Sequence, residues 1–150
     1  MKGYLNRPQE TADSLREGWF RTGDVGYMDE DGHFFLVDRL KDLILCSGYN
    51  VYPRMVEEAI YLHPAVAEVT VIGIDDDYRG QSPKAFVKLK EGEKITEDEM
   101  KTFLADKLSK IEMPSQIEFR LELPKTIIGK LSKKELVAEE VEKHKGSSTS

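Results

Sequence analysis

The sequence contains a single cysteine, Cys46, and only three histidines, which are His33, His63 and His144. One cysteine excludes an internal disulfide framework and fits a reducing, cytoplasmic setting. The scattered histidines and the lone cysteine do not form a cluster with the spacing of a zinc site, so we expect no metal site in this chain. Because Cys46 lies in an apolar stretch, we interpret it as a small core residue and not as a nucleophile.

Long apolar runs are absent as well. No segment approaches the length needed to span a membrane, and the opening residues MKGYLNRPQE lack the apolar region of a secretory signal. The net charge of −6 argues against non-specific binding to nucleic acid, which needs clustered positive charge. Neither a phosphate-binding P-loop nor a dinucleotide fingerprint occurs. What is present is a chain of 150 residues with 33% charged residues, long enough to bury a core.

The first half of the chain carries signals for a hairpin, a strand and a helix. We expect the hairpin at 27–37, because Asp31-Gly32 supplies turn residues between two apolar runs. A short buried strand is expected within 42–48. The following apolar residues have helical spacing, with Pro53 in the first turn of the helix and Pro64 at its end.

The second half continues this alternation. Two strands are predicted at 67–74 and 84–89, joined by a loop at 75–83, and a strand with strict alternation is predicted at 116–123. Two helices are predicted to begin at capping boxes, which are Thr96 to Glu99 and Ser132 to Glu135. From Asp42 onward the order is β-α-β-β-α-β-α, which predicts an α+β fold with a small mixed sheet layered with helices.

Three loop clusters contain residues that could bind a nucleotide. Asp24 lies between glycines in RTGDVG, where a carboxylate can accept hydrogen bonds from the vicinal hydroxyls of a ribose or simply cap a turn. Arg39 in VDRLKD could hold a phosphate or be the charged end of a strand. Lys130 in IIGK could swing into a site or be an ordinary exposed lysine ahead of a helix. Together the three clusters suggest a nucleotide site built on loops.

The segments GWFRTGDVGYMDEDGHFFLVDRLKDLILCSGYNVYP and PKTIIGKLSKKEL closely resemble the carboxyl-terminal part of adenylate-forming enzymes. This superfamily comprises acyl-CoA synthetases, luciferases and peptide-synthetase adenylation domains, and the nearest subgroup is that of medium- or long-chain fatty-acid CoA ligases. The resemblance covers about Gly3 to Leu136. Such enzymes convert a carboxylic acid and ATP to an acyl-adenylate and pyrophosphate, and then pass the acyl group to a thiol, usually that of CoA.

The resemblance implies a role for each candidate residue: ribose binding for Asp24, ribose and phosphate contacts for Arg39, the hinge for Lys41, the pantetheine tunnel for Ser47, Gly48 and Tyr49, and catalysis of adenylation for Lys130. Adenylation brings a carboxylate against an anionic phosphate, and a mobile cation offsets their repulsion. Losing one such contact costs on the order of 3 kcal/mol. We expect Gly129 to let the backbone approach closely without a Cβ clash.

The resemblance also implies ligands and partners. These are ATP, CoA, a carboxylic acid, Mg²⁺ held by residues outside this chain, and the amino-terminal domain of the same enzyme. A protein acetyltransferase that modifies Lys130 is a further expected partner. Accordingly, residues 1–40 are expected to be a β-rich remnant of that larger domain, 41–143 the mobile carboxyl-terminal domain, and 144–150 a disordered tail. We expect the chain alone to be inactive.

Two departures from the family pattern and two alternatives remain. Met55 stands where relatives usually have Glu, and residues 111–115 lack cations that some relatives use on the nucleotide phosphates of CoA. The first alternative is an adenylation domain that loads a carrier protein. The second is a non-catalytic binding or regulatory module, against which the presence of Asp24, Arg39 and Lys130 together speaks.

Overall fold

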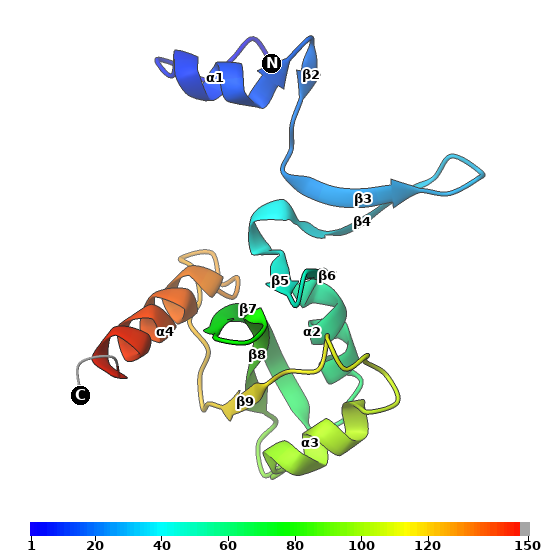
Figure 1. Ribbon diagram of the computed structural model, residues 1–150, viewed down its shortest axis with the longest axis vertical. Coiled ribbons are helices and arrows are strands. Elements are labelled where there is room, and N and C mark those ends of the chain that lie inside the picture. The colour runs from blue at the N-terminus through cyan, green and yellow to red at the C-terminus, as the bar shows by residue number, and fades with distance from the viewer. Residues whose placement is uncertain (148–150) are drawn as a thin grey trace. The chain divides into compact units, whose positions relative to one another are not determined.

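The computed structural model describes residues 1–147 and divides the chain into two compact units, Met1–Lys41 and Asp42–Ser150 (Figure 1). The boundary lies next to the one at residue 40 that the sequence predicts. None of the helices among the described residues is both long and apolar enough to cross a membrane.

The first unit contains one helix and two small antiparallel sheets. Its elements are α1 (Pro8–Ser14), β1 (Leu15–Arg16), β2 (Trp19–Phe20), β3 (Asp24–Met28) and β4 (Phe34–Arg39). The hairpin of β3 and β4 confirms the predicted one, and Tyr27 stacks on Phe35 across it with ring centroids 5.0 Å apart. The sequence did not predict the helix in this region. Helix α1 begins with Pro8 in its first turn and buries no residue. The segment therefore lacks the apolar periodicity that would predict a helix.

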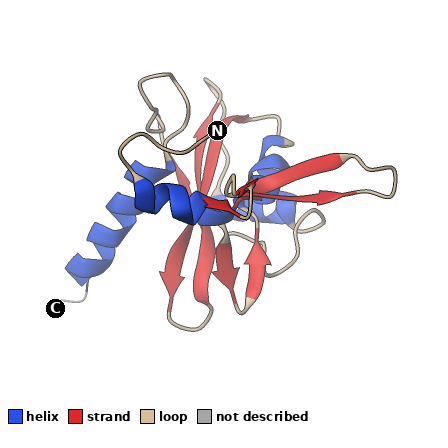
Figure 2. Cartoon of the chain, turned by 90° about the horizontal axis from the view of Figure 1, so that it is seen from above, coloured by secondary structure: helices blue, strands red, loops and turns tan. Residues whose placement is uncertain are grey.

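The second unit is built on one mixed sheet. Its elements are η1 (Leu40–Asp42, which straddles the boundary), β5 (Ile44–Cys46), β6 (Tyr49–Val51), α2 (Pro53–Tyr61), β7 (Val66–Asp76), β8 (Gly80–Leu89), α3 (Glu97–Leu104), β9 (Gln116–Phe119) and α4 (Lys133–Ser147). The strand order is β6-β5-β8-β7, and β9 runs parallel to β8 while the other pairs are antiparallel. This confirms the predicted small mixed sheet with helices (Figure 2).

Several boundaries differ from the prediction. Strand β6 was missed, and the predicted loop at 75–83 is wrong because β7 and β8 continue to a tight turn. That turn forms because the Asp76 carboxylate accepts hydrogen bonds from the N–H groups of Tyr78 and Arg79. Strand β9 ends at Phe119, before the predicted end of the strand at residue 123, and Leu121 is 92% exposed.

The helix ends differ too. Helix α2 ends at Tyr61, before Pro64, whereas α3 begins with the predicted capping box of Thr96 and Glu99. Helix α4 begins directly after Ser132, as predicted, and runs to Ser147, into the predicted tail. The rest of that tail, 148–150, lies outside the described residues.

The core lies on both faces of the sheet. Neighbouring strand residues point to opposite faces, and the pairs Val71 and Ile72 on β7 and Ala85 and Phe86 on β8 divide accordingly between two apolar clusters. The larger cluster packs under α2 and α3, and includes Cys46, as expected for a core residue. The smaller cluster contains Ile72, Phe86, Leu123 and Leu136.

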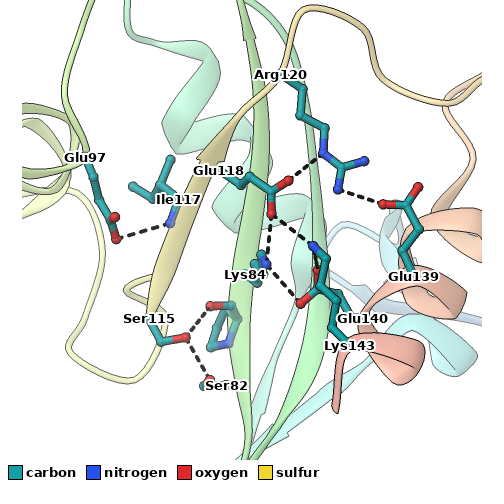
Figure 3. A network of polar contacts seen from close by, with 11 residues as sticks. Ser82, Lys84, Glu97, Ser115, Ile117, Glu118, Arg120, Glu139, Glu140 and Lys143 are labelled. Carbon is teal, nitrogen blue, oxygen red and sulfur yellow. Dashed lines mark hydrogen bonds and ion pairs between the residues drawn. The ribbon is translucent and has the colours of Figure 1, made fainter. Parts of the chain in front are cut away.

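Charged side chains next to Phe86 of the smaller cluster link α4 to the sheet (Figure 3). The Lys84 side chain is only 5% exposed and pairs with Glu118 at 3.0 Å and with Glu140 at 2.9 Å. Arg120 links Glu118 to Glu139, at 2.7 Å from each. Partial burial opposes ionisation of Glu118, but hydrogen bonds from Lys84 and Arg120 outweigh it and lower the pKa of Glu118 to about 2. These pairs hold α4 to the sheet.

Candidate functional site

Asp24 and Arg39 face each other across the first unit's hairpin. They are directly opposed in the register of β3 and β4, and Arg39 Nε lies 3.0 Å from Asp24 Oδ1. The Asp24 N–H donates to Thr22 Oγ1 at 3.1 Å, which fixes the start of the strand. Both side chains retain solvent access, 27% for Asp24 and 60% for Arg39. The hairpin thus brings together a carboxylate, which can accept hydrogen bonds from hydroxyl groups, and a guanidinium, which can pair with a phosphate. Both groups are accessible to solvent.

Lys41 is the last residue of the first unit. It lies in the short 3₁₀ helix η1, is exposed, and follows Leu40, whose N–H donates to the Gly23 carbonyl oxygen at 2.8 Å. The last hydrogen-bonded residue of the hairpin therefore precedes Lys41 directly.

Ser47, Gly48 and Tyr49 form the tip of the hairpin between β5 and β6. Because Cys46 pairs with Tyr49, Ser47 and Gly48 are a two-residue turn, and both have positive φ, 51° and 80°. This is the geometry of a type I′ turn, which matches the twist of its strands. The tip is exposed, and the Ser47 N–H donates to the Arg79 carbonyl oxygen at 2.7 Å. The tip thus adjoins the turn between β7 and β8.

A cationic cavity of about 380 Å³ adjoins the same turn. Its lining includes Arg79, Lys101 and Lys110, together with Asp76 and residues 113–115. Lys101 pairs with Glu97 at 2.7 Å and donates to the Ser115 carbonyl oxygen. Residues 111–115 themselves contain no cation, so the cations of this cavity come from other segments. Arg79 could have been found from the sequence as the only cation in the segment between the two predicted strands, where it follows three aspartates and Tyr78.

Lys130 lies on a hydrogen-bonded loop, defined here as the Lys130 loop, residues 125–131. The Thr126 N–H donates to the Lys130 carbonyl oxygen at 2.7 Å, and the Lys130 N–H donates to Thr126 Oγ1 at 3.2 Å. Gly129 has φ of 79°, and no atom of the described residues lies within 4 Å of a Cβ placed there. Glycine is favoured at this position because of its positive φ. Lys130 is exposed, as are Ile127 and Ile128 at the tip.

The residues that flank the Lys130 loop and those that flank the hairpin tip are buried in different apolar clusters. Leu123 and Leu136, on either side of the loop, are buried in the smaller cluster with Ile72 and Phe86. Cys46 and Val51, on either side of the tip, belong to the larger cluster.

One group was missed in the turn between β3 and β4. Ligand atoms of Asp29, Asp31 and His33 lie within 4.8 Å of one another. The Asp29 carboxylate accepts from the His33 N–H at 2.8 Å, and its other oxygen lies 3.3 Å from His33 Nδ1. These bonds hold Asp29 and His33 together across the turn.

The fold and these loops define a small α+β domain with two separate exposed loops, one that carries a lysine and one that is a glycine turn at the tip of a hairpin. Residues 55–130 match the family described as the AMP-binding enzyme C-terminal domain. The match covers half of the chain, and the chain belongs to this family.

Known proteins are similar over nearly the whole chain. A long-chain-fatty-acid–CoA ligase of Bacillus subtilis is 52% identical over 96% of the chain, which spans 26% of that protein. An amide bond synthetase, McbA from Marinactinospora thermotolerans, superposes with a TM-score of 0.85 at 38% identity, covering 93% of this chain and 29% of the other. The o-succinylbenzoate CoA synthetase of Bacillus subtilis, solved with its acyl-adenylate intermediate, gives 0.85 at 35% identity, covering 91% and 28%. The chain thus spans about a quarter of such proteins.

Proposed function

We propose that this chain acts as the carboxyl-terminal part of an AMP-forming acid–thiol ligase. The enzyme uses ATP to convert a carboxylic acid to an acyl-adenylate and then transfers the acyl group to CoA. The acid is a fatty acid, by analogy with the ligase of Bacillus subtilis. Mg²⁺ is held by residues outside this chain, and the reaction takes place in the cytoplasm.

The observation that carries this proposal is the separation of two candidate groups within one unit, since the residues flanking the Lys130 loop are buried in the smaller cluster and those flanking the hairpin tip in the larger one. The two half-reactions need different groups at the same reacting carbon, first a cation and then a path for a thiol. A domain that rotates about Lys41 would present the Lys130 loop for adenylation and the Ser47–Gly48 tip for thioester formation. Lys41 lies at the boundary between the two units, where such a rotation would occur.

Asp24 and Arg39 serve the nucleotide in this scheme. One carboxylate oxygen of Asp24 is paired with Arg39, and the other can accept from a ribose hydroxyl. Arg39, 60% exposed, can contact the ribose or the α-phosphate as well as the carboxylate. Lys130 then offsets the repulsion between the substrate carboxylate and that phosphate.

The first unit supports the expected partnership with a larger amino-terminal domain. Trp19 and Phe34 are each 80% exposed and Leu36 is 67% exposed. Large apolar side chains exposed on a unit of this size indicate a surface that another protein segment covers.

The cationic cavity favours CoA over a carrier protein as the acceptor. The nucleotide end of CoA carries several phosphate charges, and Arg79, Lys101 and Lys110 line a cavity next to the hairpin tip. A carrier-bound pantetheine has a single phosphodiester and leaves such a cavity without an anion. These cations compensate for the ones missing from residues 111–115.

The test uses the full-length protein that contains this sequence. ATP–pyrophosphate exchange is measured with a panel of fatty and aromatic acids, and then product formation is measured with CoA, carrier-bound pantetheine and a simple amine. We expect exchange with fatty acids and product with CoA. Amide formation with the amine alone would instead favour the activity named for McbA. Absence of exchange with every acid would favour the non-catalytic module.

Acetylation of Lys130 is part of this proposal, since neutralising the cation removes its effect on adenylation. Lys125 and Lys133 are engaged in ion pairs with glutamates, whereas the structure records none for Lys130 in the described part of the chain. Mass spectrometry after treatment with an acetyltransferase and acetyl-CoA should therefore find modification concentrated on Lys130. Equal modification of Lys125, Lys130, Lys133 and Lys134 would contradict this.

A further inference from the structure

Two ion pairs flank the Lys130 loop, one on each side. Lys125 Nζ lies 2.6 Å from Glu68 Oε1, and Lys133 Nζ lies 2.9 Å from Glu57 Oε1. Glu68 is on β7 and Glu57 is on α2, far from the loop in sequence. The loop is therefore tied to two different elements of the domain.

Both pairs are partly shielded from water. Exposed fractions of the side chains are 39% for Lys125 and 24% for Glu68, and 26% for Lys133 and 18% for Glu57. The Lys125 pKa is raised, chiefly by its hydrogen bond to Glu68. Glu57 Oε1 also accepts from the Val71 N–H at 2.9 Å, so this glutamate is itself fixed against β7. Pairs with this degree of burial constrain their side chains more than fully exposed ones.

The loop between the two pairs is short and internally bonded. Lys125 and Leu131 form an isolated antiparallel bridge, and the Ser132 N–H donates to the Pro124 carbonyl oxygen at 2.8 Å. The tip residues Ile127 and Ile128 are exposed and add no packing within this unit. The orientation of the loop therefore depends on its two ends, where the ion pairs act.

We propose that Glu57 and Glu68 are positioning residues that aim Lys130 at the reacting carboxylate and phosphate. The inference rests on the proposed function. A catalytic cation must be held close to its productive place, since a small displacement lowers the rate strongly. Neither glutamate touches the substrate. Each acts through the lysine that it holds, Glu57 through Lys133 and Glu68 through Lys125.

The first experiment measures the loop itself in this chain. Amide hydrogen exchange by NMR is compared for the original chain, Lys125→Met, Lys133→Met and Lys134→Met. Lys134 is the matched control, because it neighbours Lys133 and the described residues record no ion pair for it. We expect the amides of Thr126 and Ser132 to exchange roughly fivefold faster in the first two variants and unchanged in the control. Lys133→Arg, which keeps the pair, should restore slow exchange.

The second experiment measures catalysis in the full-length protein. Lys125→Met and Lys133→Met should each lower the rate of adenylate formation about fivefold or more, while thioester formation from preformed acyl-adenylate changes little. A general loss of stability would instead lower both steps and the melting temperature together. Lys133→Arg should recover adenylation, and Lys134→Met should behave as the original.

The outcomes separate this inference from the proposed function. Faster loop exchange with a selective loss of adenylation supports both. Unchanged exchange in Lys125→Met and Lys133→Met, or faster exchange with undiminished adenylation, overturns the positioning role. A full-length protein that forms no acyl-adenylate with any acid removes the proposed function and this role with it, even where the exchange data show that the pairs hold the loop.

Discussion

Neutralising Glu118 should weaken the second unit and change its response to acid. The pKa of Glu118 is lowered from 4.5 to about 2 in the folded chain, against the effect of burial, by hydrogen bonds from Lys84 and Arg120. At about 1.4 kcal/mol per pKa unit, the full shift corresponds to about 3 kcal/mol of stability. Because the side chain is 32% exposed, solvent screening reduces this to about 1–2 kcal/mol.

The direction with pH follows from the lowered pKa. The stabilisation is fully present above pH 4.5, where the carboxylate is ionised in both states, and is lost as pH falls from 4.5 toward 2. Glu118→Gln should therefore cost about 1–2 kcal/mol at pH 7 and almost nothing at pH 2. In this variant Lys84 keeps Glu140 and Arg120 keeps Glu139, so no buried charge is left unpaired.

Urea unfolding followed by circular dichroism, at several values between pH 7 and 2, measures this difference. Fluorescence is unsuitable, because the only tryptophan, Trp19, lies in the first unit. Glu122→Gln is the control, since the Glu122 side chain is 81% exposed and its ion pair with Lys88 is longer, at 3.3 Å. Parallel stability curves for the original chain and Glu118→Gln across this range would refute the reasoning.

Three further predictions concern the proposed activity. Lys130→Ala in the full-length protein should lower adenylate formation about a hundredfold or more while sparing thioester formation from preformed acyl-adenylate, and equal losses in both steps would contradict the role of Lys130. Lys41→Pro should impair thioester formation more than adenylation, because fixing φ and removing an N–H restricts rotation at the boundary; a loss confined to adenylation would show that the hinge lies elsewhere. The 150-residue chain alone should catalyse no ATP–pyrophosphate exchange, since it has no phosphate-binding loop, and measurable exchange would disprove this.

Short-range signals predicted much of the fold. The Asp31-Gly32 turn, Pro53 in the first turn of α2 and the capping box of Thr96 and Glu99 each act within a few residues, and the structure has a hairpin or helix at each. Helix α1 escaped prediction because it buries no side chain and so has no apolar stripe. Strand β6 was not predicted because the turn before it has Ser47 at positive φ. Asn-Gly at these two positions would have indicated a hairpin turn, whereas Ser-Gly does so less clearly.

The end of β9 depended on its neighbour in the sheet. The alternation of apolar residues continues to Leu121, but the parallel register with β8 stops at Val87 and Phe119. Beyond it the chain leaves the sheet, exposing Leu121 and burying Leu123 in the cluster on the opposite face. Alternation predicts which side chains share a face only as long as a partner strand is present.

The candidate residues themselves were found by motif, but their surroundings came only from the structure. Lys130 was singled out because it follows a glycine, and the structure shows that this glycine has a positive φ. Lys125 and Lys133, its neighbours in sequence, pair with Glu68 and Glu57 through contacts between residues far apart along the chain. A local pattern can identify a lysine with freedom to move. How that freedom is limited depends on long-range pairs, and these determine whether its charge reaches the same place in each catalytic cycle.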